Sequence, residues 1–171
     1  MERDPESSGF TEFASARWLS LVRSARLLGC TTAEAEDVAQ ATLVKCYLAW
    51  PRVSAAASPE AYAARVLLNV HRQSRRRRWW GERPTEHLPE VTADDRTDEV
   101  ADADVVRRAL TRLGKGQLEA VVLRHYLGLS ERETAEVLGV PVGTVKSRLS
   151  RALTQLAASD ELRDIRDGRT S

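Results

Sequence analysis

Residues 130–151 (SERETAEVLGVPVGTVKSRLSR) constrain this chain most, because they fit two short helices joined by a tight turn. Ser130 and Glu133 have the spacing of a capping box, which starts a helix. Gly139 suits a left-handed cap at the end of that helix, and Pro141 suits the first turn of the next. The pattern is typical of a helix-turn-helix, which places its second helix in a DNA major groove. The apolar contacts between the two helices would come from Ala135, Leu138, Val145 and Leu149.

The second of these helices divides into an apolar face and a polar, basic face. The apolar positions, which we expect to be buried, are Val145, Leu149, Ala152, Leu153 and Leu156. The opposite side carries small polar residues and cations, namely Gly143, Ser147, Ser150, Arg151 and Thr154, flanked by Lys146 and Arg148. Small side chains let the backbone approach a groove, and the cations can pair with phosphates or guanine edges. The alternative is an ordinary surface helix with a solvated charged face, but the capped two-helix spacing favours DNA binding.

Charge is unevenly distributed along the 171 residues, although the formal net charge is only +1. Residues 65–85 carry seven Arg against one Glu, and residues 105–156 carry nine Lys or Arg against four Glu. Between them, residues 86–104 carry eight acidic residues against one Arg. Two basic blocks separated by an acidic one favour two domains that face nucleic acid, joined by a spacer.

The sequence contains no segment that predicts a membrane, metal or cofactor site. No stretch approaches the ~20 consecutive apolar residues that a membrane span needs, and the polar start of the chain lacks a signal-peptide pattern, so we expect a cytoplasmic protein. Cys30 and Cys46 have no Cys or His at metal spacing, which predicts reduced, partly buried thiols, with a redox-sensing pair as the alternative. His71, His87 and His125 also lack partners at ligand spacing, and we expect neither a cofactor nor a small-molecule substrate.

Helix-favouring composition without apolar–polar alternation predicts an all-α protein of two helical domains. Thr31 with Glu34 forms a second capping box, and Ser58 before Pro59 suits a helix start. The expected helices before the helix-turn-helix run from about Phe10 to Leu28, from Thr31 to about Trp50, and over 59–80, 99–113 and 115–127, with a loop at 51–58. The expected divisions are a first domain at 8–82, a flexible acidic linker at 83–98, a second domain at 99–157 and a polar tail at 158–171.

The helix expected over 33–50 has a second face that is not plainly solvent-facing. Its core stripe would be Ala35, Ala39, Thr42, Leu43, Cys46 and Trp50, and the opposite side carries Asp37, Gln40, Ala41, Val44 and Leu48. Polar acceptors beside exposed aliphatic side chains are more typical of a partner-docking surface than of simple solvent exposure.

The helix over 59–80 carries cations along one face, where Arg65, Asn69, Arg72 and Arg76 recur at intervals of four, three and four residues. Tyr62 lies one turn before them. Cations, an amide and an aromatic ring suit single-stranded or locally opened DNA, through phosphate contacts, base hydrogen bonds and stacking. The alternative is an Arg-rich surface helix. For Trp79 and Trp80, which follow the Arg run, we expect a role in sealing the end of the domain.

Three segments of the chain resemble a known family. They are residues 33–50 (AEAEDVAQATLVKCYLAW), residues 60–78 (EAYAARVLLNVHRQSRRRR) and residues 118–153, which contain the specific run PVGTVKSR. In this order, with a linker before the third, they make the chain resemble a group IV, or extracytoplasmic-function, sigma factor of bacterial RNA polymerase, over roughly residues 10–157. The resemblance implies that 8–82 is sigma region 2 and that 99–157 is sigma region 4.

The resemblance also implies a transcription initiation factor that binds core RNA polymerase and directs it to promoter DNA, without being an enzyme, and that is held by an anti-sigma protein. The residues that would dock on the polymerase are Asp37, Gln40, Val44 and Leu48. Those that would recognise the promoter −10 element are Tyr62, Arg65, Asn69, Arg72 and Arg76. Those that would contact the −35 element are Arg124, Pro141, Gly143, Lys146, Ser147, Arg148, Ser150 and Arg151.

Two other classes of protein remain as alternatives. A two-domain helix-turn-helix regulator would bind a palindromic operator tightly without polymerase, commonly as a symmetric dimer. A gel shift with and without core polymerase distinguishes such a regulator from a sigma factor. A metal-dependent nuclease built on Glu34, Glu36 and Asp37 is disfavoured, because these acids have no His or second carboxylate cluster, and Glu34 is better used as a helix cap.

Overall fold

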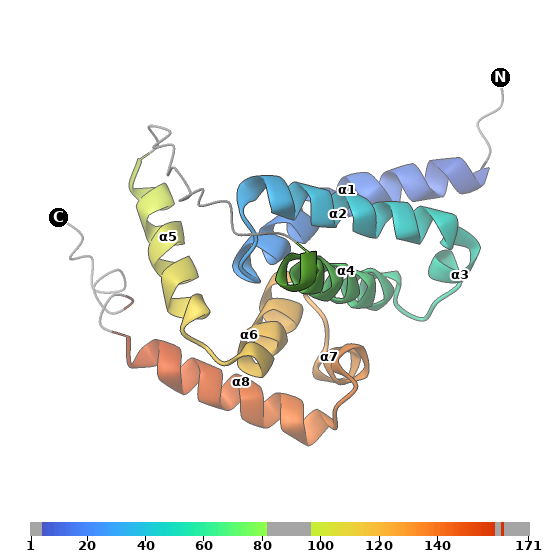
Figure 1. The fold of residues 1–171 in the computed structure, drawn as a ribbon. Helices are drawn as coiled ribbons and strands as arrows, with labels where there is room; N and C mark the ends of the chain where they lie inside the picture. Colours follow the sequence, from blue (N-terminus) through green and yellow to red (C-terminus); the bar gives the residue numbers. More distant parts are fainter. Residues whose placement is uncertain (1–4, 82–96, 160–161, 163–171) are drawn as a thin grey trace.

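The computed structural model describes residues 5–81, 97–159 and 162, which form helices with short connections (Figure 1). The elements are α1 (Pro5–Leu27), α2 (Thr32–Leu48), α3 (Trp50–Ser54), α4 (Pro59–Gly81), α5 (Thr97–Thr111), α6 (Lys115–Val121), the π-helical turn η1 (Val122–Tyr126), α7 (Glu131–Leu138) and α8 (Val142–Ala157). The expectation of an all-α protein with two helical domains is confirmed over the described residues. Much of the expected linker at 83–98 and of the expected tail at 158–171, as well as His87, lies outside them.

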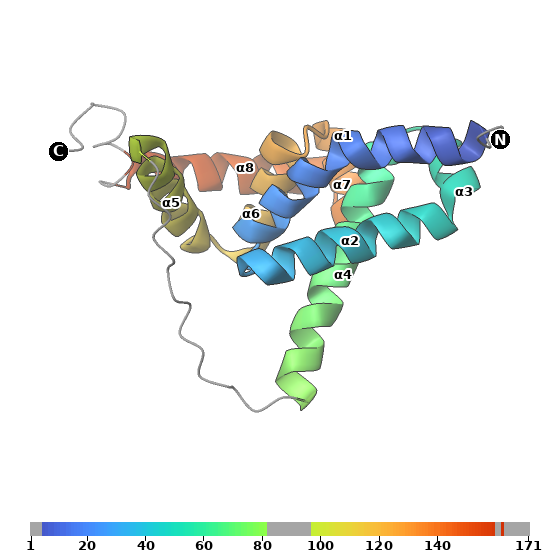
Figure 2. The ribbon, with the colours of Figure 1, turned by 90° about the horizontal axis from the view of Figure 1, so that it is seen from above.

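The first domain is built from α1, α2, α3 and α4. Helices α1 and α2 lie side by side, and α4 crosses them, with its C-terminal end extending away from the other helices (Figures 1 and 2). Leu21, Val38 and Leu67 bring the three helices together in one apolar core. A smaller cluster joins Phe10 and the ring of Trp50, whose centroids are 5.4 Å apart in an edge-on arrangement.

The expected helix starts in this domain are confirmed by their hydrogen bonds. The backbone N–H of Thr31 donates to Glu34 Oε2 over 2.9 Å, and the backbone N–H of Glu34 donates to Thr31 Oγ1 over 3.4 Å. The Ser58 hydroxyl accepts from the backbone N–H of Ala61 over 3.1 Å, at the start of α4. Each cap satisfies backbone donors that would otherwise lack a partner, which typically contributes about 1 kcal/mol.

The helix-turn-helix is present as expected, in α7 and α8. The backbone N–H of Ser130 donates to Glu133 Oε2 over 2.8 Å, and that of Glu133 donates to Ser130 Oγ over 3.1 Å, which closes the capping box. Gly139 ends α7 with φ of 66°, a left-handed conformation that side chains other than glycine rarely adopt. Pro141 stands one residue before the first helical position of α8 and acts as its N-cap residue.

Several local expectations were wrong. The loop expected at 51–58 instead begins with α3, because Pro51 fits a first helical turn and Val53 is fully buried against the Trp50 cluster. The helix expected over 115–127 changes into the π-helical η1, where the backbone N–H of Leu127 bonds the carbonyl of Val122. Helix α1 starts at Pro5, and α5 starts at Thr97, inside the expected linker.

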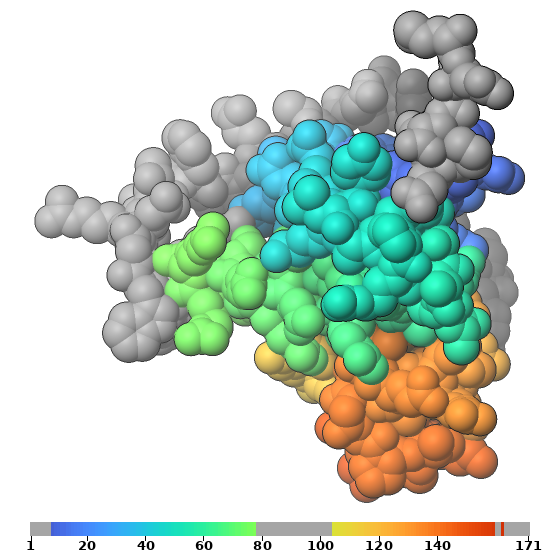
Figure 3. Space-filling model, turned by 90° about the vertical axis from the view of Figure 1, so that its right-hand side faces the viewer, coloured from blue at the N-terminus to red at the C-terminus, as the bar shows by residue number. Residues whose placement is uncertain are grey.

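The second domain packs directly on the first. Its core of Val122, Leu123 and Val145 continues without a break into Leu28 at the end of α1 and Leu68 on α4. In the space-filling view, α4 lies between α2 and α3 on one side and α7 and α8 on the other (Figure 3). Burying apolar surface across this junction favours the packed arrangement. Nothing in the sequence analysis predicted how the two domains would sit together.

Candidate nucleic-acid interface

The polar face of α8 points away from the rest of the second domain. Gly143, Ser150 and Arg151 are exposed, whereas Val145, Leu149 and Ala152 on the other face are buried. The division of the helix into two faces is therefore confirmed, with one correction. Leu153 is 52% exposed, not buried, because it lies at the edge of the apolar stripe toward the end of the helix. The outward face thus offers a smooth surface of small groups beside a cation, which is what a DNA groove can accept.

Three cations assigned to the same interface are less free than Arg151. Lys146 Nζ lies 3.7 Å from Glu131 Oε2 at the start of α7. The Arg148 guanidinium lies against α6, where a Cβ added at Gly116 would meet its Cζ at 3.0 Å. Arg124 is half-buried in η1. Ser147 is also half-buried, and its hydroxyl donates to the Thr144 carbonyl over 3.0 Å.

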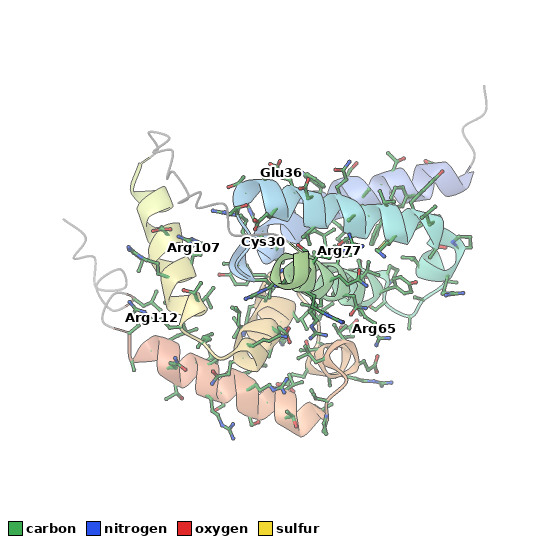
Figure 4. The ribbon with its side chains drawn as sticks, viewed as in Figure 1. Cys30, Glu36, Arg65, Arg77, Arg107 and Arg112 are labelled. Atoms are coloured by element: carbon green, nitrogen blue, oxygen red, sulfur yellow. The ribbon has the colours of Figure 1, made fainter. Side chains whose placement is uncertain are left out.

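Two members of the cationic stripe of α4 contact the second domain, although Arg65 stays exposed and Arg72 is only half-buried. Arg65 Nη2 donates to the carbonyl oxygen of Glu136 over 2.8 Å, so the side chain reaches from α4 to α7 (Figure 4). Arg72 Nη2 donates to both carboxylate oxygens of Glu119 on α6, over 3.1 and 3.0 Å. Asn69 stays exposed. The sequence patterns identified the stripe but gave no signal for Glu119 or Glu136 as its partners.

The two other members of the −10 set lie at opposite ends of the stripe. Tyr62 is half-buried against the apolar cluster of Cys46, Val53 and Ala63, which leaves only part of its ring available for stacking. Arg76 is exposed on the projecting half of α4. The side chains of Trp79 and Trp80 lie outside the described part of the chain, so their expected role stays a prediction.

The outer face of α2 has the polar and apolar mixture that the sequence predicted. Asp37 and Gln40 are exposed, and beside them Val44 is 51% and Leu48 77% exposed. A hollow of about 290 Å³ runs from this face onto α1, and Phe10, Trp18 and Tyr47 are among the residues that line it. Exposed aliphatic and aromatic side chains on one surface are typical of a protein-docking site. The contribution of α1 to this surface was not predicted, because aromatic residues on α1 fit a core pattern equally well.

The two cysteines are buried in different apolar clusters and are not joined to each other by a disulfide. Burial raises the pKa of Cys46 to about 11, so this thiol stays protonated near neutral pH. Cys30 Sγ lies 3.4 Å from His71 Nδ1, and both side chains are buried. Burial and the neighbouring charge of Arg75 lower the pKa of His71.

Within the described ranges, no group of three or more His, Cys, Asp or Glu side chains could hold a metal ion. Among the helices that the structure describes, none has an apolar run long enough to cross a bilayer.

Comparison with protein families accounts for both domains. Residues 17–81 match the model of sigma-70 region 2, and residues 103–156 match that of sigma-70 region 4. The RNA polymerase sigma-E factor of Streptomyces avermitilis is 39% identical over 156 residues, which cover 91% of this chain and 87% of the relative. The ECF RNA polymerase sigma factor SigM of Mycobacterium tuberculosis is 36% identical over 138 residues, which cover 80% of this chain and 69% of the relative.

Solved structures share the same arrangement of helices. The structure of CnrH in complex with the cytosolic domain of CnrY has a TM-score of 0.64 and 26% identity, covering 87% of this chain and 85% of that one. The sigma factor RpoE of Bartonella quintana, crystallised with the anti-sigma factor NepR, has a TM-score of 0.66 and 24% identity, covering 89% of this chain and 97% of that one. The latter likeness concerns the fold alone.

Proposed function

The chain belongs to the extracytoplasmic-function branch of the sigma-70 family of RNA polymerase sigma factors, and on that premise we propose how its surfaces divide the work of promoter recognition. As a sigma factor it binds RNA polymerase and directs promoter recognition, and it is not itself an enzyme. The assignment of individual residues to polymerase, to the −10 element and to the −35 element is our proposal.

We assign reading of the −35 element to the outward face of α8. The observation that carries this assignment is the exposure of Gly143, Ser150 and Arg151 along one side of a capped helix-turn-helix. Arg151 suits a guanine edge, while Pro141 and Ser147 would bring the backbone close to the groove. Contacts to phosphate would come from the flanking cations Arg124, Lys146 and Arg148.

We assign the −10 element to α4. Asn69 can hydrogen-bond a base, and Arg65, Arg72 and Arg76 can neutralise phosphates of an opened strand, while Tyr62 offers part of a ring for stacking. Arg65 and Arg72 donate hydrogen bonds to the second domain in the packed arrangement, so their guanidinium groups become fully available only when the domains separate. Binding to polymerase would supply the free energy for that separation.

We assign polymerase docking to the exposed face of α2, with Asp37, Gln40, Val44 and Leu48. Polymerase works in the bacterial cytoplasm, which is where we expect this factor. An anti-sigma protein is a further partner that we propose from membership of the family. The hollow between α1 and α2 is a suitable surface for it, because its lining is apolar and it adjoins the docking face.

A gel shift with a promoter fragment, with and without core polymerase, tests the assignment. We expect a specific complex only when polymerase is present, because the free chain keeps Arg65 and Arg72 engaged. Tight binding of a palindromic duplex by the chain alone would instead support the operator-binding regulator, which no described contact favours. Run-off transcription from a library of promoters then identifies the −10 and −35 sequences that the factor selects.

A further inference from the structure

A cavity of about 760 Å³ lies at the junction of the two domains, where the end of α1 and the middle of α4 face α6. Its charged lining comes from both domains: Arg72, Arg75 and Arg76 from the first, and Lys115 and Glu119 from the second. Glu119 is already paired with Arg72. In the part of the chain that the structure describes, no acidic side chain lies within ion-pair distance of Arg75, Arg76 or Lys115. The cavity therefore has an excess of positive charge.

The cavity also has apolar lining residues. Leu27, Leu28, Leu113 and Leu118 line it, close to the buried ring of His71. A volume of this size is within the range that holds a small molecule, and apolar walls with a few convergent polar groups are usual in such sites. Guanidinium and ammonium groups are the side chains that most often bind phosphate. A lining that combines cations with apolar side chains suits a molecule that has both phosphate groups and a ring.

We propose that this cavity binds a small phosphorylated ligand of the nucleotide class, and that the bound ligand holds the two domains together. Arg75 and Lys115 would both contact its phosphates. Because these residues belong to different domains, the complete site exists only in the packed arrangement, and the ligand must stabilise that arrangement over the separated one. The consequence for transcription rests on the function proposed above, since Arg72 and Arg76 belong to the −10 set.

Titration calorimetry on the full chain tests the binding, with ATP, GTP, adenosine and inorganic phosphate as separate probes. We expect at least one nucleotide to bind about tenfold more tightly than adenosine or inorganic phosphate, because only the nucleotide can contact both the cations and the apolar residues of the lining. Equal affinity for inorganic phosphate, or no binding of either nucleotide, would overturn the proposal.

Variants locate the site. Arg75→Ala and Lys115→Ala should each weaken nucleotide binding about tenfold or more, the effect of losing one charge-assisted phosphate contact. Arg77→Ala is the matched control, because Arg77 is an exposed neighbour on α4 that does not line the cavity. Equal weakening by Arg77→Ala would mean general attraction to a basic helix and would contradict a built site. Circular dichroism of each variant verifies folding, and Lys115→Gln provides a milder change if Lys115→Ala unfolds the domain.

The alternative to a nucleotide in this cavity is the chain's own acidic block at residues 86–104. A variant with Glu86, Glu90, Asp94 and Asp95 changed to amides removes part of its charge. If nucleotide bound only to this variant, the cavity would belong to the chain's own acidic segment, and the proposal would fail. Because the free chain is already packed, the link to domain packing is tested on Glu119→Gln, which weakens the Arg72 pair between the domains. Nucleotide should reduce the radius of gyration of this variant in small-angle scattering. An unchanged radius would overturn the link to domain packing. If the chain binds no nucleotide but still directs initiation from promoters, the nucleotide site is rejected and the proposed function stands.

Discussion

Arg72 on α4 and Glu119 on α6 join the two domains through a guanidinium–carboxylate pair, with Nη2 3.0 Å from Oε2. The Glu119 side chain is 8% exposed and that of Arg72 is 39% exposed, so the carboxylate is buried while the guanidinium keeps contact with water. A buried carboxylate depends on such a partner, because removing it from water without one is costly. The same guanidinium is a proposed DNA contact. The pair therefore links closure of the domains to the loss of a DNA-binding group.

Glu119→Gln should loosen the packing of the two domains while keeping the side-chain shape. Hydrogen bonds to charged groups contribute about 1.5–3 kcal/mol, and we expect the lower end here because Arg72 is partly exposed. The free chain should then show a larger radius of gyration in small-angle scattering and bind single-stranded promoter DNA more tightly.

Glu136→Gln is the matched control for this change. Its carboxylate pairs with Arg132 within α7, on the exposed surface, and this pair does not join the domains. We expect the radius of gyration to stay unchanged, because exposed pairs of this type contribute little. Equal radii for Glu119→Gln and the unmodified chain would show that the Arg72 pair does not hold the domains together.

Arg151→Ala should weaken recognition of the −35 element by about 1–3 kcal/mol and relax the base preference there. The side chain is exposed on the outward face of α8, so its removal should leave the fold intact. The measurement is run-off transcription by the polymerase complex on templates with each base varied in the −35 element. Arg108→Ala on α5, which removes the same charge away from α8, is the control. Unchanged promoter choice after Arg151→Ala would contradict the assigned face.

Local structure was predictable where a short pattern decides it. The capping boxes at Thr31 and Ser130 and the left-handed Gly139 each depend on residues within four positions of one another, and all three are present. The burial of Val145 and Leu149 also follows from helical periodicity alone. Helical periodicity also predicts the outward face of α8, because that face is determined once the buried face is known.

What could not be predicted depends on distant parts of the chain. The helical state of Trp50–Ser54 depends on Val53 packing against α1 and α4, which periodicity within 51–58 does not reveal. The engagement of Arg65 by the Glu136 carbonyl joins residues 71 positions apart. Surface cations on a helix have the same sequence signature whether they meet solvent, DNA or a second domain. Only the packing of α4 on α7 distinguishes these cases.

Asp37→Arg should weaken binding to core polymerase while leaving the second domain folded. Asp37 is exposed on the outer face of α2, beside Gln40. A reversed charge at this position would therefore contact a polymerase bound to that face. We expect a loss of the order of 1–3 kcal/mol for a reversed charge at a docking surface. Co-purification with core enzyme measures the loss. Glu12→Arg is the control, since Glu12 is an exposed acid on α1 that does not line the hollow beside α2. Undiminished co-purification of Asp37→Arg would exclude this face.

His71 should make the folded chain less stable as the pH falls from 7.5 toward 5.5. Burial lowers the pKa of His71 below its usual 6.5, and Arg75 lowers it further, while Glu119 partly opposes them. The neutral ring is therefore favoured in the fold, and the unfolded chain takes up a proton first as the pH drops through about 6.5. The free energy of unfolding falls over that interval and levels off below the pKa of the folded state. Urea unfolding at half-unit pH steps measures it.

His71→Gln should flatten this pH dependence, because the amide cannot titrate. His125→Gln, at an exposed position in η1, is the control and should leave the dependence unchanged. The carboxylates of Asp104 and Glu133, whose pKa values are lowered from 3.8 and 4.5, titrate below this window and do not obscure it. Arg75 acts on His71 from one turn further along α4, whereas Glu119 and Lys115 act on it across the domain junction. A slope that survives in His71→Gln would assign the effect to another group.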